Sequence, residues 1–294
     1  MLADPLEPTC RPAFEFAEAC IEKHFPIAKD TWQLTVAAPS LAARVVPGQF
    51  FMVRIAGHND PLLGRALAMY DMHRDAAGQP HSISVVYTVK GKFTQALSRC
   101  SVGDRIELWG PLGNGFSKTP IDHLILVAGG VGQTPMLTLA SGALGFAKYG
   151  EEADVKLFAR EVTLCYGART KDYLAGLNDF ERVCSSVRIA TDDGSLGFHG
   201  RVTEVLKEVL KEVLAGSKTT CRIACCGPEP MMEAVSEVAR SFGVECEVSL
   251  ETPMACGIGI CFTCVAKIKQ SDGEWDYQRT CIEGPVFDAE KIVW

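Results

Sequence analysis

Residues 124–135 read LILVAGGVGQTP, and they decide the fold class of this 294-residue chain. The apolar run Leu124–Ala128 is typical of a strand buried on both faces of a parallel sheet. A glycine-rich turn follows, and a helix is expected from Thr134 to about Phe146. Backbone N–H groups at the start of a helix attract anions, so the turn is a candidate pyrophosphate site. Its candidate residues are Gly129, Gly130, Gly132, Thr134 and Pro135. The turn lacks the G-x-G-x-x-G spacing, so an ordinary strand-to-helix turn is the alternative.

Composition and charge exclude several classes of protein. The uncharged run from residue 124 to 147 is long enough to span a bilayer, but its glycines and Pro135 favour a strand, a turn and a helix. The net charge of −7 argues against nucleic acid or a membrane surface as a partner. Residues 1–14 lack the basic start and apolar run of a signal peptide. Thirteen cysteines, an odd number, argue against a disulfide framework and favour a reducing, cytoplasmic setting.

The chain after residue 120 alternates strands and helices, which indicates a parallel α/β sheet. Further strands are expected at 162–166, 187–190, 222–225 and 244–250, and helices at 201–214 and 229–242. Cys226, Gly227 and Pro228 follow one of these strands. Strand ends line the ligand crevice of such sheets, so Cys226 is a candidate neighbour of a nicotinamide ring. A buried thiol without function is the equal alternative.

The first part of the chain, to about residue 118, is expected to form a small β-barrel, because short β-rich runs are separated by turn signals. The runs are 32–36, 50–55, 82–89 and 105–109, the last one stopping at Gly110-Pro111. Arg65 is a candidate for neutralising a flavin pyrophosphate. A surface arginine without function is the alternative.

The last segment carries the spacing Cys256-x4-Cys261-x2-Cys264-x16-Cys281. Gaps of four and two residues are typical of a plant-type [2Fe–2S] cluster, which needs four converging thiolates. Glycines at 257 and 259 permit the tight bend that brings three of them together. A hairpin, with strands near 265–268 and 275–279 and a turn at 272–273, is expected before the fourth. A structural zinc site and free thiols are the alternatives, although zinc sites favour two C-x2-C pairs.

Together these motifs resemble the electron-transfer subunit of the NAD-dependent (class B) dihydroorotate dehydrogenases, within the ferredoxin reductase superfamily. The resemblance runs from about Pro47 to Trp294, and its strongest parts are 110–116, 129–135, 251–264 and 281–287. It implies an α+β multidomain protein in three parts. These are a flavin-binding antiparallel β-barrel with an N-terminal extension (1–118), a parallel α/β nucleotide-binding domain (119–245) and a small C-terminal [2Fe–2S] segment (246–294).

The resemblance also implies the residues that bind each cofactor. FAD is expected on Arg65, Ala66, Leu67, Ala68, Val86, Tyr87, Thr88, Gly91, Phe93 and Thr94, and NAD on the 129–135 turn with Cys226, Gly227 and Pro228. The family's usual flavin motif is Arg-Pro-x-Ser, so Ala66 and Ala68 are departures, and Phe93-Thr94 replaces a Gly-Thr pair. The serine hydroxyl often contacts the flavin ring, and that contact must here be missing or supplied by backbone.

The implied function is a relay with no catalytic acid or base on this chain. An FMN-containing catalytic subunit oxidises dihydroorotate in pyrimidine biosynthesis, and electrons pass through the cluster and FAD to NAD⁺. The expected assembly is a heterotetramer with two copies of each subunit. One alternative is a sulfide dehydrogenase or transhydrogenase-type NAD(P)H–ferredoxin oxidoreductase subunit. That group often has aspartate at the first cluster position, which Cys256 argues against. The other is a redox-responsive regulatory protein.

Overall fold

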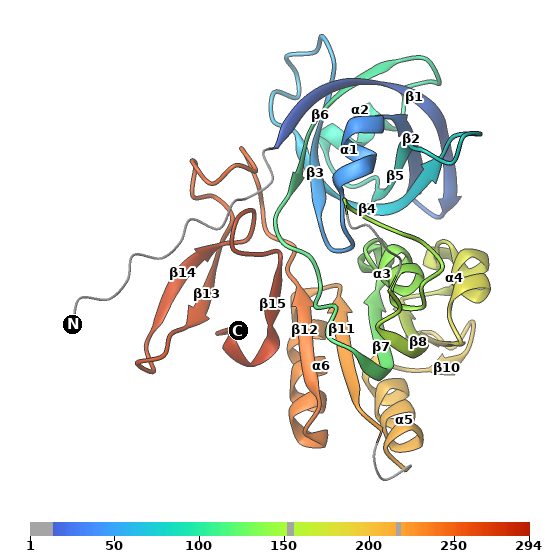
Figure 1. The fold of residues 1–294 in the computed structure, drawn as a ribbon, viewed down its shortest axis with the longest axis vertical. Helices are drawn as coiled ribbons and strands as arrows, with labels where there is room; N and C mark the ends of the chain where they lie inside the picture. The colour runs from blue at the N-terminus through green and yellow to red at the C-terminus, as the bar shows by residue number, and fades with distance from the viewer. Residues whose placement is uncertain (1–13, 152–155, 216–218) are drawn as a thin grey trace.

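The computed structural model describes residues 14–151, 156–215 and 219–294, so the first 13 residues of the predicted barrel domain lie outside it. Six antiparallel strands close into a barrel in the order β1-β2-β5-β4-β3-β6 (Figure 1). They are β1 (Glu15–Ala28), β2 (Thr31–Ala37), β3 (Phe50–Ile55), β4 (Arg65–Arg74), β5 (Pro80–Thr88) and β6 (Arg105–Leu112). Helices α1 (Pro39–Arg44) and α2 (Lys92–Leu97) bury apolar side chains in the barrel core. The predicted barrel is confirmed.

A seven-stranded sheet below the barrel has the order β10-β9-β8-β7-β11-β12-β15 (Figure 1). Its parallel strands are β7 (Ile121–Gly129), β8 (Ala159–Ala168), β9 (Ser186–Thr191), β10 (Phe198–His199), β11 (Cys221–Cys226) and β12 (Glu245–Ser249), and β15 (Val286–Asp288) is antiparallel to β12. Its helices are α3 (Met136–Ala143), α4 (Leu177–Val183), α5 (Val202–Leu214) and α6 (Glu229–Phe242), with short 3-10 turns η1 (Gly130–Gln133) and η2 (Lys171–Tyr173).

Both faces of this sheet are covered, which explains the unbroken apolar run of β7. Leu124 and Leu126 pack with α3 and α4, while Ile125 and Val127 pack with α5 and α6. The predicted parallel α/β domain is therefore confirmed. The uncharged run from residue 124 to 147, which is long enough to span a bilayer, instead forms most of β7, then η1 and α3. Over the described ranges, no helix is long and apolar enough to cross a membrane.

The C-terminal segment forms a hairpin and then returns to the large sheet. β13 (Val265–Lys269) pairs with β14 (Trp275–Arg279), as the sequence predicts, and the 3-10 turn η3 (Ala289–Lys291) follows β15. Figure 1 shows the hairpin beside β15 and below the barrel. The domain boundary at residue 245 stays a prediction. Strand β12, which begins at this residue, and β15 further on belong to the same sheet as β7.

Two predicted boundaries are wrong. β6 does not stop at Gly110-Pro111 but continues to Leu112, because a register shift between Phe50 and Met52 on β3 accommodates the proline that cannot donate a hydrogen bond. The helix expected from Thr134 to Phe146 is shorter. It starts only after the 3-10 turn η1 and ends at Ala143, just before Gly145 with its positive φ of 73°.

A buried arginine binds the segment that connects the barrel to the sheet. Arg222 on β11 is 3% exposed, and its guanidinium donates to the carbonyl oxygens of Ser117 (3.1 Å) and Thr119 (3.2 Å). Its ion pair with Glu245 is longer, at 3.4 Å, and Glu245 is exposed. The two backbone contacts therefore carry the interaction.

Substituting Arg222→Leu is expected to lower the melting temperature by about 4 °C or more, because two carbonyl groups lose their donor and each such loss costs about 1–3 kcal/mol. Thermal unfolding of the purified chain measures this. Lys207→Ala removes only an exposed ion pair with Glu204 and is the matched control, with a change of about 1 °C or less. Equal shifts in the two variants would contradict the role given to Arg222.

Candidate cofactor sites

The two nucleotide motifs lie at the same place on the sheet. β7 leads into the turn at 129–135, and its neighbour β11 leads into Cys226-Gly227-Pro228. The strand order reverses between them, since β8 and β9 lie on one side and β12 on the other. Ligands of open α/β sheets bind in the crevice at such a point, beside the carboxyl ends of the strands. The fold therefore brings together both motifs that the sequence predicts for NAD.

Most glycines in the two loops are required because the loops pack too closely for a larger side chain. A Cβ on Gly132 would lie 2.3 Å from the carbonyl oxygen of Cys226, and one on Gly227 would lie 3.0 Å from the backbone nitrogen of Gly129. Gly130 differs, because it has a φ of +54° and no atom within 4 Å of its Cβ position. Gly130 is thus the position where a ligand has room to approach the backbone.

Thr134 and Pro135 shape the turn into α3. The Thr134 hydroxyl donates to the carbonyl oxygen of Val131 at 2.7 Å, and Pro135 is the residue before the first turn of the helix. The thiol of Cys226 lies by Ser249 and Glu251, and burial raises its pKa to about 12. Cys226 therefore stays protonated at neutral pH, which suits a contact residue rather than a nucleophile.

The predicted flavin residues of β4 point to two different neighbours. Leu67 lies in the barrel core, whereas Ala66 and Ala68 pack on the outside against a group of residues that contains Cys264 and Cys281. Arg65 is exposed at the start of the strand, and its guanidinium donates to the carbonyl oxygen of Gly64 at 3.2 Å. The outer surface of β4 is thus small and apolar, and it packs on the same group of residues as two of the cysteines.

The predicted flavin residues of β5 also divide. Val86 packs into the core shared with the large sheet, while Tyr87 points into the barrel, where its hydroxyl lies 2.8 Å from Nε2 of His24. Thr88 is half-buried at the end of the strand.

At the start of α2, the Thr94 hydroxyl accepts from the backbone N–H groups of Lys90 (2.9 Å) and Gly91 (3.1 Å). The Phe93 side chain is fully buried in the barrel core. A flavin contact at residue 93 would therefore involve the main chain.

The loop with the first three cysteines is fixed to the barrel. Trp109 of β6 donates from Nε1 to the carbonyl oxygen of Cys256 at 2.8 Å. Gly257 has a φ of +72°, and a Cβ there would lie 2.5 Å from Cγ of Met52. Gly259 also has a positive φ, of 80°. The two glycines therefore make the bend that the sequence predicts, and Gly257 also permits close packing on the barrel.

The four thiols are arranged as two pairs. The outer pair is Cys256 and Cys261, at or near the surface, and the inner pair is Cys264 and Cys281, each 1% exposed. The two thiols of each pair interact with each other, and Cys281 also lies near enough to Cys256 to feel its charge. The Thr263 hydroxyl donates to Sγ of Cys261 at 3.1 Å and is the main reason that the pKa of this thiol falls to about 6. Burial, with the nearby Cys264, raises the pKa of Cys281 to about 12.

The set of four thiols fits a two-iron cluster. Zinc sites favour two C-x2-C pairs, and this segment has one. Each iron of a [2Fe–2S] cluster takes two protein ligands, so two pairs of thiols suffice. The backbone N–H of Ile258 also approaches Sγ of Cys256 at 3.4 Å, and such donors are typical around cluster sulfurs.

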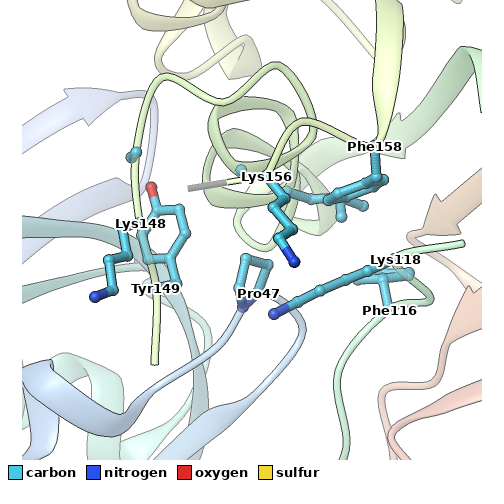
Figure 2. A pocket seen from close by; sticks show the side chains of 10 residues that line it. Pro47, Phe116, Lys118, Lys148, Tyr149, Lys156 and Phe158 are labelled. Atoms are coloured by element: carbon cyan, nitrogen blue, oxygen red, sulfur yellow. The ribbon is translucent and has the colours of Figure 1, made fainter. Parts of the chain in front are cut away.

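A separate small cavity lies between the barrel and the sheet (Figure 2). Its lining includes Pro47, Phe116, Tyr149 and Phe158, with Lys118, Lys148 and Lys156 around it. Its volume is about 30 Å³. No residue predicted to bind a cofactor lines it.

The sequence did not single out three residues that support the cluster loop. Trp109 and Thr263 make the hydrogen bonds given above, and Arg279 donates to the carbonyl oxygen of Gly259 at 3.1 Å while pairing with Glu283. Trp109 and Arg279 act on residues distant in the sequence, so no local pattern marks them. Thr263 lies inside the cysteine motif. In the sequence, only its hydroxyl group could have marked it as a hydrogen-bond donor to a cysteine.

Three family models match consecutive parts of the chain. They are an oxidoreductase FAD-binding domain over residues 18–116, an oxidoreductase NAD-binding domain over residues 126–237, and the iron-sulfur cluster binding domain of dihydroorotate dehydrogenase B over residues 251–293. The chain thus contains domains for all three cofactors expected from its sequence, in the same order.

Individual relatives agree with these models. A dihydroorotate dehydrogenase B (NAD(+)) electron transfer subunit from Desulforamulus reducens is 36% identical over 92% of this chain and 95% of its own length. The subunit of the same name from Geobacillus thermodenitrificans is 35% identical over 91% of this chain and 94% of its own length. A solved structure of an NADH-dependent reduced ferredoxin-NADP oxidoreductase is 30% identical, with a TM-score of 0.73 over 95% of this chain and 90% of that one. This chain therefore belongs to the family of dihydroorotate dehydrogenase B electron transfer subunits.

Proposed function

We propose that this chain carries electrons from an FMN-containing, dihydroorotate-oxidising subunit to NAD⁺, through a [2Fe–2S] cluster and FAD held by its own residues. The single observation that carries the proposal is that the predicted flavin strand packs on the same group of residues as two of the predicted cluster ligands. Ala66 and Ala68 of β4 pack against the group that contains Cys264 and Cys281. The relatives named as electron transfer subunits of dihydroorotate dehydrogenase B support the reaction and the partner.

When bound, the cluster and FAD would supply one-electron transfer and the exchange of two electrons as a hydride with NAD⁺. The chain binds and positions these groups. Cys256, Cys261, Cys264 and Cys281 are the proposed cluster ligands. The residues expected from the sequence on β4, β5 and the start of α2 are the proposed FAD contacts, and those on the two loops of the sheet are the proposed NAD contacts. No side chain is proposed as a general acid or base.

The partner is proposed to dock where the outer pair reaches the surface. Ile260 is 73% exposed and Phe262 is 63% exposed on the same loop as Cys261. Phe16, also exposed, stacks on Trp109, whose Nε1 holds the carbonyl of Cys256. Exposed apolar side chains gathered at one site are typical of an interface. A heterotetramer with two copies of each subunit and a cytoplasmic location belong to the same proposal.

A transhydrogenase-type NAD(P)H–ferredoxin oxidoreductase subunit is the second candidate. The observation that favours it is the 30% identity to the solved NADH-dependent reduced ferredoxin-NADP oxidoreductase. Electron transfer from ferredoxin, but not from a dihydroorotate-oxidising subunit, would favour this candidate.

Anaerobically purified chain is expected to contain about one FAD and two irons, without zinc. Cys261→Ser should remove most of the iron and of the cluster absorbance while the flavin stays bound, because Cys261 is exposed and lies outside the barrel core. Metal and flavin analysis measures both. Cys20→Ser, another exposed cysteine, is the control and should lose neither cofactor. Zinc in place of iron, or loss of FAD together with iron, would defeat the proposed arrangement.

Ile260→Glu is expected to lower dihydroorotate-dependent NAD⁺ reduction by about tenfold or more when the catalytic subunit is limiting, because a charge is buried in the interface. Oxidation of NADH by an artificial acceptor should stay within about twofold of wild type, since this reaction does not need the partner. Phe146→Glu changes a similarly exposed apolar side chain in the loop after α3 and should affect neither assay. Unchanged coupling in Ile260→Glu would show that the partner docks elsewhere.

A further inference from the structure

One polar side chain of the turn at 129–135 is buried without a partner. Gln133 is the last residue of η1, and its side chain is fully buried. Among the residues that the structure describes, neither the amide oxygen nor the amide nitrogen of Gln133 has a hydrogen-bond partner. A buried amide destabilises the folded chain unless new hydrogen bonds replace those that it made to water. The unpaired amide therefore calls for a physical explanation.

The hydroxyl groups that reach this turn are already paired. The Thr134 hydroxyl donates to the carbonyl oxygen of Val131. The Tyr166 hydroxyl donates to the carbonyl oxygen of Gly130 at 3.1 Å and accepts from the backbone N–H of Ala175 at 3.1 Å. Pairing the buried amide with either hydroxyl would break a hydrogen bond that already exists.

The open side of the turn is within reach of the buried amide. Residues three apart lie on the same side of a 3-10 helix, so positions 130 and 133 are neighbours along η1. Gly130 has a φ of +54°, and no atom lies within 4 Å of its Cβ position. Rotation of the long Gln133 side chain would carry its amide toward this open space, where a ligand can approach the backbone.

A charged acceptor would make this rotation favourable. By leaving the core, the amide gives up no hydrogen bond, although the two methylene groups of Gln133 lose their packing. Hydrogen bonds to an ionised oxygen are stronger than those between neutral groups. The pyrophosphate of a dinucleotide offers such oxygens, and the start of α3 attracts the same group. A neutral acceptor would compensate less for the lost packing.

We propose that Gln133 is a latent binding residue for the dinucleotide. In the complex, its side chain leaves the core, and its amide N–H donates to a pyrophosphate oxygen of NAD⁺. This hydrogen bond exists only in the complex, so Gln133 lowers the stability of the free chain and raises its affinity for the dinucleotide. The inference rests on the proposed function, because it requires NAD⁺ to bind at the turn.

Gln133→Met tests the inference in the purified chain with its cofactors bound. Methionine has a similar length but buries no amide, so the melting temperature without NAD⁺ should rise by about 2 °C or more. The dissociation constants of NAD⁺ and of ADP-ribose should each increase by about tenfold, because both ligands lose the contact to their pyrophosphate. Isothermal titration calorimetry measures both constants.

Thr138→Val is the matched control. Thr138 of α3 is also fully buried, but its hydroxyl donates to the carbonyl oxygen of Pro135 at 3.4 Å. This substitution should not raise the melting temperature and should leave both dissociation constants within about twofold of wild type.

Three results would overturn the inference. They are an unchanged affinity for NAD⁺ in Gln133→Met, a loss of affinity for NAD⁺ but not for ADP-ribose, and a lower melting temperature in this variant. A wild-type chain that binds no NAD⁺ would instead overturn the proposed function.

Discussion

The structure depends on one constraint: four thiols must gather beside the outer face of a barrel without unfolding either part. Three of them come from a single bent loop, which two glycines with positive φ make possible, and the fourth arrives after a hairpin. The Trp109–Cys256 hydrogen bond fixes the loop to β6. Asn114 fixes the segment that follows the fourth thiol, since its amide donates to the carbonyls of Glu283 and Val286 and accepts from the N–H of Val286. The barrel thus holds the cysteine segment at both ends.

The cysteine segment is in contact with both of the other parts of the chain. β15 returns to the edge of the large sheet beside β12, so the segment with the cysteines is also tied to the nucleotide-binding domain. The inner pair belongs to the same packed group as the outer surface of β4, and the turn after β7 lies beside the loop after β11.

Local patterns in the sequence predicted much of this arrangement. The apolar run of β7, the amphipathic α5, the helix α6 and the hairpin β13–β14 are all found where the residues indicate. The long strand β1 was not predicted, because only Ala19 and Ile21 of it are buried and its pattern is weak. The cysteine spacing predicted the ligand type, but not that the thiols separate into an inner and an outer pair. That separation depends on packing against Phe50, Met52 and Leu112, which are distant in the sequence. The glycines of the two nucleotide loops were expected to admit a ligand, and most of them serve contacts between the loops instead.

The central claim is that these four cysteines hold two irons as two pairs. X-ray absorption at the iron edge of the purified, unreduced chain tests it most directly, because the spectrum reports the atoms bound to iron and its metal neighbours. The account predicts a first shell of sulfur only, together with scattering from a second iron close by. Iron with nitrogen or oxygen ligands, or iron without a metal neighbour, would contradict it.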